Sequence, residues 1–265
     1  MSSRNSKTAK AAARERLRAQ REKEQKRAKV RRQVFVGVGV VVVLAAAAGI
    51  AVAVNNANKP SYWSAAAKDK LVVPAHASGK NGTTIIVGDA KNKNVLHEYE
   101  DLRCPVCAAY EQESGAAVLK GAQDGKYQID YTLGTFLDDA NPGDGSKKAL
   151  SAAGAALNVS TEAFEQFHTL IYSKKYHPDE NVDKLDDVSY LLKVADQVPA
   201  LKGNTKFSDA VKKGTFDKWA LTMSNAFNSS GVNQTPTVKL NGKDLSVVSV
   251  PSATVMSTIE AGLTK

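Results

Sequence analysis

Residues 98–107 read Glu98-Tyr99-Glu100-Asp101-Leu102-Arg103-Cys104-Pro105-Val106-Cys107, and they hold the two cysteines of the 265-residue chain. The run that leads into this stretch, Val95 to Tyr99, is rich in residues that favour strands. The residues from Cys107 to Leu119 have the Ala, Glu, Gln and Leu content of a helix. The sequence therefore predicts a pair of cysteines at the point where a strand is followed by the start of a helix.

Two cysteines three positions apart can open and close a disulfide across the first turn of a helix without a change of fold. The unpaired N–H groups and the positive end of the helix dipole stabilise a thiolate at Cys104. We therefore expect Cys104 to be the nucleophile, near the surface, and Cys107 to be the more buried resolving thiol.

Three other roles for the two cysteines were weighed. A structural disulfide usually ties distant segments, because so short a loop removes little chain entropy. A structural zinc site usually needs four Cys or His ligands, and the four histidines lack the spacing of metal ligands, so no metal is expected. A pair of inert core cysteines stays open on the motif alone. The histidines are His76, His97, His168 and His177.

The N-terminal part of the chain has the composition of a membrane anchor. Residues 1–32 contain 13 Lys or Arg and three Glu, a net charge of +10, and an uncharged apolar run follows at 34–54. Residues 33–265 carry a net charge of −1. An apolar helix of this length spans roughly 30 Å, enough for a bilayer core. The positive-inside rule then puts the basic arm, 1–32, in the cytoplasm and everything after the anchor, 33–54, outside the cytoplasm.

Two other interpretations of this region are weaker. A cleavable signal peptide has a shorter apolar core, of about 7 to 15 residues, although Ala51-Val52-Ala53 offers small residues to a peptidase. Nucleic-acid binding by the arm is not expected, because residues 1–32 contain no aromatic residue and a place beside a membrane span explains the basic charge better. We expect an uncleaved single-pass anchor in the cell membrane.

The rest of the chain divides into a linker and one domain. Residues 55–82 are rich in Asn, Lys, Ala and Ser and read as an extracytoplasmic linker. Residues 83–265 suit one domain with its own core. Strands are predicted at 83–87, 95–99, 127–133, 237–240 and 245–250.

Helices are predicted in the long gap before the last two strands. Phe164, Phe167, His168 and Ile171 recur with helical spacing after the caps Ser160 and Thr161. A second helix is predicted over 185–195, a long one over 208–228 with Gly231 just past its end, and a closing one over 252–263. This order predicts an α/β domain with a helical insertion at about 143–230.

Two segments of this domain carry a resemblance to a known family. The stretch 98–107 resembles the active-site segment of the thioredoxin superfamily. The stretch Gly231-Val232-Asn233-Gln234-Thr235-Pro236-Thr237, followed by Asn241-Gly242, resembles its cis-proline loop. The long helical gap between the two is similar to the DsbA-like branch, and the likeness covers about residues 83–263. The two motifs in this order and separation are far more specific than C-x-x-C alone.

The resemblance implies a thioredoxin-like fold with an inserted helical subdomain and no cofactor. It implies a cis peptide bond before Pro236, with Thr235 offering backbone groups to an extended substrate. Pro105 and Val106 are expected to contact substrate as well. The resemblance also places a buried acid at Glu98, which would relay a proton to or from Cys107.

These features predict an extracytoplasmic thiol–disulfide oxidoreductase that forms or exchanges disulfides in exported proteins. The resemblance implies a membrane reoxidase as partner, of the DsbB or vitamin K epoxide reductase type. Many oxidant members of the DsbA-like group carry His where this chain has Val106, so a dedicated reductase is an alternative. A non-catalytic binding or chaperone module is another.

Overall fold

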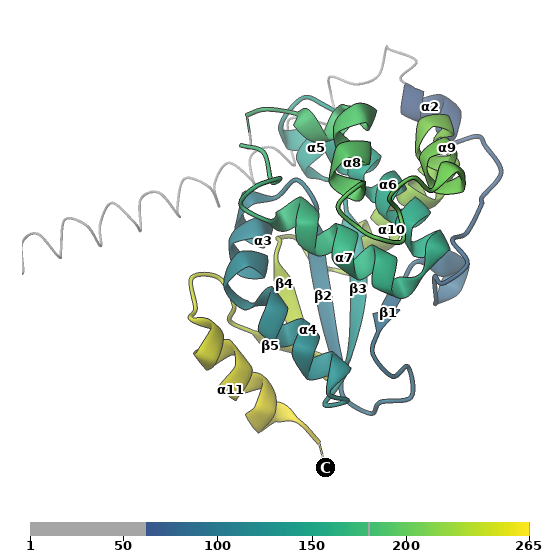
Figure 1. The fold of residues 1–265 in the computed structure, drawn as a ribbon. Helices are drawn as coiled ribbons and strands as arrows, with labels where there is room; N and C mark the ends of the chain where they lie inside the picture. The colour runs from purple at the N-terminus through teal and green to yellow at the C-terminus, as the bar shows by residue number, and fades with distance from the viewer. Residues whose placement is uncertain (1–61, 180, 265) are drawn as a thin grey trace, which may run out of the picture. The chain divides into compact units, whose positions relative to one another are not determined.

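Five strands form one mixed sheet in the order β1-β3-β2-β4-β5 (Figure 1). The structure is a computed structural model that describes residues 62–179 and 181–264. The central strands β2 (Val95–Asp101) and β3 (Gln128–Gly134) are parallel, and the other neighbours are antiparallel. The outer strands are β1 (Ile85–Val87), β4 (Thr237–Leu240) and β5 (Lys243–Leu245).

A nearly continuous helical segment returns from the end of β2 across the sheet and connects it to β3. It begins as α3 (Pro105–Tyr110), widens into the π-helical turn η2 (Glu111–Gly115) and ends as α4 (Ala116–Gln123). A π-helical turn inside an α-helix is rare and often lies at a functional site. The C-terminal helix α11 (Ser252–Gly262) packs against α4 and η2.

The chain between β3 and β4 is helical and gathers above the sheet in the view of Figure 1. Helix α7 runs across the sheet in front, and α10 packs against β3. The elements are α5 (Leu137–Ala140), α6 (Gly145–Val159), α7 (Thr161–Tyr172), η3 (Lys184–Asp186), α8 (Val188–Ala195), α9 (Thr205–Lys213) and α10 (Asp217–Asn228).

The predicted helix after Ser160 is confirmed, and so is the reason for its start. The Ser160 hydroxyl accepts a hydrogen bond from the backbone N–H of Ala163, as an N-cap does. Phe164, His168 and Ile171 are all buried on its inner face. Helix α7 therefore presents a mostly apolar side to the domain, with one histidine in it.

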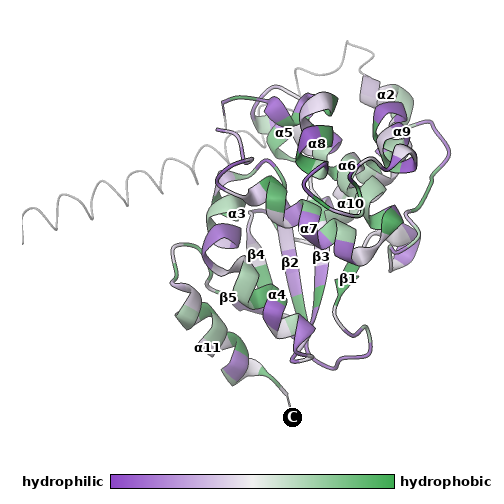
Figure 2. Cartoon of the chain, viewed as in Figure 1, coloured by the Kyte–Doolittle hydropathy of each residue, from purple (hydrophilic) through white to green (hydrophobic). Residues whose placement is uncertain are grey.

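The core contains buried polar groups as well as apolar ones. In Figure 2, strands β2 and β3 are hydrophobic at their lower ends and more hydrophilic further up, between the packed helices. Glu98, Glu100 and Asp101 of β2 are each 0 % exposed. Burying an ionised acid costs free energy unless the acid is protonated or hydrogen-bonded. This cluster therefore indicates a functional site in this part of the core.

The predicted last strand, 245–250, is wrong. The backbone of Asn241 and Gly242 has positive φ at both residues, which is the geometry of a tight two-residue hairpin turn. The partner strand therefore begins at once, at Lys243, and Leu240 pairs with Lys243. Residues 246–250 form a loop instead, with Val247 buried and Ser249 at φ 59°.

The predicted long helix over 208–228 is two helices, α9 and α10. The break lies at Gly214, whose left-handed backbone (φ 62°) ends α9. A Cβ at this position would lie 2.2 Å from a carboxylate oxygen of Asp217 and 2.4 Å from the hydroxyl oxygen of Tyr62, so the close approach also requires glycine.

The predicted linker, 55–82, is not free of the domain where the structure describes it. Residues Tyr62–Ala66 form helix α2, and Trp63 is only 5 % exposed. The Tyr62 hydroxyl donates to the Asp217 carboxylate, and the Lys148 ammonium lies 3.7 Å from the centre of the Tyr62 ring. The aromatic pair binds this segment to the helical region, although the overall composition resembles that of a linker.

The membrane-anchor prediction lies outside the residues that the structure describes. Within residues 62–179 and 181–264, none of the helices has the length and apolar character needed to cross a membrane. The basic arm and the apolar run at 34–54 stay predictions from sequence.

Candidate active site

The chain places Cys104 at the start of α3, as the sequence predicts. Strand β2 ends at Asp101, and the backbone N–H of Cys104 donates to the Asp101 carbonyl at 2.8 Å. Cys104 has extended backbone angles (φ −73°, ψ 120°) and is the N-cap, and Pro105 is the first helical residue. Proline suits this place because its fixed φ fits a helix start and no donor is lost there.

The two thiols differ in environment. Their side chains lie 3.6 Å apart, with Cys104 5 % exposed and Cys107 0 % exposed. Cys107 is thus the more buried thiol, as predicted, but Cys104 is itself nearly buried instead of open at the surface. The hydrogen bond from the Cys107 thiol, aided by the N–H groups at the helix start and opposed by burial, lowers the pKa of Cys104 to about 7. Burial raises the pKa of Cys107 well above its usual range.

We expect an alkylating reagent at about pH 6 to label Cys104 in preference to Cys107. With a pKa of about 7, Cys104 is about one-tenth thiolate at that pH, whereas an ordinary cysteine is well under one-hundredth thiolate. Brief treatment of the reduced protein with iodoacetamide, followed by peptide mapping, measures the ratio. Equal or preferential labelling of Cys107 would reverse the assignment of the nucleophile.

The loop before β4 lies against Cys104. The Thr235–Pro236 peptide bond is cis, as the resemblance implied. The Cys104 sulfur lies 3.8 Å from the backbone carbonyl oxygen of Thr235. The structure therefore brings together two motifs that are about 130 residues apart in the chain.

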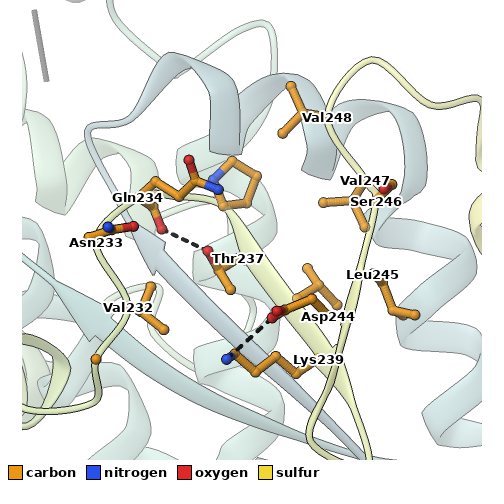
Figure 3. A pocket seen from close by; sticks show the side chains of 13 residues that line it. Val232, Asn233, Gln234, Thr237, Lys239, Asp244, Leu245, Ser246, Val247 and Val248 are labelled. Atoms are coloured by element: carbon orange, nitrogen blue, oxygen red, sulfur yellow. Dashed lines mark hydrogen bonds and ion pairs between the residues drawn. The ribbon is translucent and has the colours of Figure 1, made fainter. Parts of the chain in front are cut away.

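A groove of about 470 Å³ runs along this loop, between residues 231–238 and the connection after β5. Figure 3 shows the side chains that line it, with the Thr237 hydroxyl donating to the Gln234 carbonyl and Lys239 paired with Asp244. Val106 lies outside this groove and lines a second, more apolar hollow with residues 247–251. The two hollows share Val247 and Val248, so they adjoin each other.

Three carboxylic acids lie beneath the dithiol. Oxygen atoms of Glu98, Glu100 and Glu111 lie within 4.8 Å of one another. Burial raises the pKa of all three well above the usual range. The charge of Glu100 adds to the effect at Glu98 and Glu111, and the charges of Cys104 and Asp101 add to it at Glu100. Among the described residues no other group of acids, histidines or cysteines is close enough to share an ion. Carboxyls that favour the neutral state suit proton transfer better than they suit a cation.

The acid that faces Cys107 is Glu100, not Glu98. Helix α3 runs back over β2, and Tyr110 of α3 donates to Glu98 at 3.0 Å. Cys107 is three helical residues, about 4.5 Å, before Tyr110, and Glu100 is two strand residues, about 6.7 Å, beyond Glu98 on the same face. Cys107 therefore lies opposite Glu100, and the charge of Glu100 contributes to the raised pKa of Cys107.

The predicted burial of Glu98 is confirmed, since Glu98 is 0 % exposed. The proton-relay role of Glu98 stays a prediction, and the acid whose charge acts on Cys107 is Glu100. The two acids are two residues apart, so both point to the same face of β2, and the sequence offered no reason to choose the second. His97 points to the other face, as predicted, where its ring stacks on Tyr99 and bonds Thr132.

A buried ionic network behind Cys104 was not predicted. Arg103 is 3 % exposed and pairs with Asp138 at 3.4 Å and with Asp183 at 3.5 Å. Asp101 accepts hydrogen bonds from the Ser146 hydroxyl at 2.7 Å and from the backbone N–H groups of Arg103 and Leu137. The network joins the turn between β2 and α3 to the helices that follow β3.

Comparison with known proteins agrees with this geometry. The sequence profile described as thioredoxin matches residues 80–260. The chain belongs to the thioredoxin family. No curated protein sequence matches the chain.

Solved structures place this family member among the DsbA-like thiol–disulfide oxidoreductases. The reduced disulfide bond oxidoreductase DsbG from Mycobacterium tuberculosis is 27% identical, with a TM-score of 0.59 over 68% of this chain and 88% of its own. Reduced DsbA from the same organism is 27% identical, with a TM-score of 0.58 over 68% and 92%. MdbA from Actinomyces oris, at 19% identity and a TM-score of 0.59 over 75% and 93%, shares the fold.

Proposed function

We propose that this protein is a membrane-anchored, extracytoplasmic oxidoreductase that forms or exchanges disulfides in exported proteins through Cys104 and Cys107. The observation that carries the proposal is the position of Cys104, a thiol of lowered pKa at a helix N-terminus, 3.8 Å from the carbonyl of the cis-proline loop. A nucleophilic sulfur is thereby next to backbone groups that can hold an extended substrate.

The reaction is thiol–disulfide exchange in two steps. A substrate thiolate attacks Cys104 in the Cys104–Cys107 disulfide, so that a mixed disulfide forms and Cys107 leaves as a thiolate that takes up a proton. A second substrate thiolate then attacks the substrate sulfur of the mixed disulfide and releases Cys104. The low pKa of Cys104 makes its thiolate the better leaving group. The substrate gains a disulfide and the enzyme becomes a dithiol.

Reoxidation needs a partner, because Cys104 and Cys107 are the only cysteines in the sequence. A membrane reoxidase of the DsbB or vitamin K epoxide reductase type would take the two electrons. The exported location rests on the basic arm and the apolar run at 34–54. Membrane fractions that release the full-length chain on carbonate washing, or a mature N-terminus near Ala53, would contradict the anchor.

The residue between the cysteines affects the direction of exchange. The Val106 side chain carries no charge, so it adds nothing to the stabilisation that the backbone N–H groups give the Cys104 thiolate of the reduced form. We expect Val106→His to make the disulfide more oxidising by tens of millivolts, since a shift of one pKa unit corresponds to about 30 mV for a two-electron couple. Equilibration of both proteins against glutathione buffers measures this. An unchanged or lower reduction potential in Val106→His would mean that the helix start and the buried acids, and not the side chain at position 106, set the potential.

Refolding of reduced, denatured ribonuclease A tests the proposed activity directly. The oxidised protein should restore ribonuclease activity in proportion to the amount added, and Cys104→Ala should restore none above the background. A wild-type protein that fails in this assay but reduces insulin disulfides would be a dedicated reductase. Failure in both assays, with the protein folded, would favour the non-catalytic binding module.

A further inference from the structure

We propose that His168, from helix α7 of the helical region, is a positioning residue for the resolving step, in which it holds the Glu100 carboxyl so that Glu100 exchanges a proton with Cys107. The inference rests on the proposed function and names a residue through which the helical region takes part in it.

The contact between His168 and Glu100 is specific and buried. The His168 Nε2 atom lies 2.8 Å from the Oε2 atom of Glu100, and the side chains are 3 % and 0 % exposed. The two residues are 68 positions apart, and one lies on β2 and the other on α7. This hydrogen bond directly joins the acid beneath the dithiol to the helices that lie between β3 and β4.

The surroundings fix the histidine in one orientation. Its ring packs against Tyr131 and Tyr172 with ring centres 4.9 Å apart in each case, and against Phe164 at 5.5 Å. A ring held on three sides cannot turn away from Glu100 without a change in the core packing. Glu100 is thereby held in place on β2, and its charge contributes to the raised pKa of Cys107.

Many buried histidines with one hydrogen bond only pack in the core. The charges around His168 distinguish it from such a residue. Burial lowers the pKa of His168, and the nearby carboxylates of Glu111 and Glu165 oppose that shift. A neutral imidazole beside a carboxyl of raised pKa forms a pair that can gain or lose one proton with little movement. The titratable groups that face this pair are Glu98, Asp101, Cys104, Cys107, Tyr110, Glu111, Tyr131, Glu165 and Tyr172.

The resolving step moves one proton and exchanges one disulfide bond for another. In the mixed disulfide with a substrate, the Cys107 thiol loses its proton to the Glu100 carboxylate, and its sulfur attacks Cys104. The bond between the two enzyme sulfurs forms, the bond between Cys104 and the substrate breaks, and the substrate leaves as a reduced thiolate. In the opposite direction Glu100 returns the proton to Cys107. His168 stays hydrogen-bonded to Glu100 throughout.

The two thiols can be followed separately in one experiment on the reduced full-length chain in detergent. Mixing with dithiobis-nitrobenzoate in a stopped-flow instrument releases one coloured thiolate when Cys104 attacks the reagent. A second is released when Cys107 resolves the resulting mixed disulfide. The second phase is independent of reagent concentration, so its rate reports the resolving step alone, and it is measured between about pH 5 and pH 9.

We expect His168→Leu to slow the second phase about tenfold or more and to leave the first within about twofold, since a hydrogen bond to a charged group is lost. In His168→Leu the rate of the second phase should rise with pH over a range in which the wild-type rate no longer changes. His168→Gln, which can still reach Glu100, should recover most of the rate. His168→Asn, one carbon shorter, should not. His97→Leu, a histidine on the opposite face of β2, is the matched control and should leave both phases unchanged.

Two results would overturn the inference. One is a second phase in His168→Leu and His168→Asn as fast as in the wild type. The other is a result in which His168→Gln and His168→Asn each slow both phases equally and lose the same melting temperature. That result would mean that His168 only packs in the core. If His168→Leu fails to fold, the rates of the second phase in His168→Gln and His168→Asn still test the inference. A wild-type protein that releases no second thiolate would instead contradict the proposed function itself.

Discussion

Replacing Cys107 with Ser should stop the enzyme at the mixed disulfide. Cys104 keeps its position at the helix start and can still join a substrate, but the thiol 3.6 Å away that releases the substrate is gone. Release then depends on a thiol from solution. Because an intramolecular group acts at an effective concentration far above that of millimolar thiols, release should slow on the order of a thousandfold or more.

Cells that produce Cys107→Ser should therefore show the protein in a ladder of larger species on non-reducing gels, and reducing agent should collapse the ladder to one band. Cys104→Ser is the matched control, because it keeps one thiol, but the buried one of raised pKa, and it should give no ladder. A folded, exported Cys107→Ser protein that runs only as a monomer would favour a domain without redox turnover.

Much of this site is predictable from local sequence. Cys104 and Pro105 define a helix start through their own chemistry, and Gly231 to Thr237 with the later Asn-Gly pair mark a turn and a strand. The structure confirms the helix start, the cis bond before Pro236 and the greater burial of Cys107. The helix start depends on residues that lie close together in the chain, whereas the cis bond was expected from the resemblance that the two motifs carry together.

The structure differs from the sequence predictions where a contact between residues far apart in the chain sets the local arrangement. Glu98 and Glu100 have the same residue type and share one face of β2, so only the path of α3 over the sheet shows which acid lies opposite Cys107. His168 fits the apolar spacing of α7 and reads as a core residue from sequence. Its meeting with Glu100 depends on how the helical region folds back onto β2, which no local pattern encodes.

The structure departs from the linker prediction at helix α2, Tyr62–Ala66, for a similar reason. Composition alone favoured a tether, but Trp63 packs into the domain and Tyr62 bonds Asp217, a residue 155 positions away. An aromatic pair within an otherwise polar stretch was the signal that sequence offered. The break at Gly214 was signalled as well, since glycine within a helical pattern often ends the helix.

Replacing Arg103 with Met should destabilise the fold by about 1 to 3 kcal/mol, because it removes the hydrogen bonds of a buried guanidinium, while Asp138 keeps its ion pair with Lys147 at 3.2 Å. Arg103 is 3 % exposed, its Nη1 atom donates to the Asn141 carbonyl at 2.9 Å, and the Asp138 side chain it pairs with is 0 % exposed. Burial raises the pKa of Asp138, and the Lys147 ammonium beside it opposes that shift.

Urea unfolding of the oxidised and the reduced protein measures this loss. Lys120→Met removes an exposed pair, since the Lys120 side chain is 71 % exposed, and as the matched control it should cause no measurable change. Arg103 lies next to Cys104, and its ion pairs tie the turn before α3 to Asp138 and Asp183 in the helical region. A loss of stability below about 1 kcal/mol would mean that the buried aspartates take up protons at little cost. The helical region would then be held to the dithiol mainly by apolar packing and by the contact between His168 and Glu100.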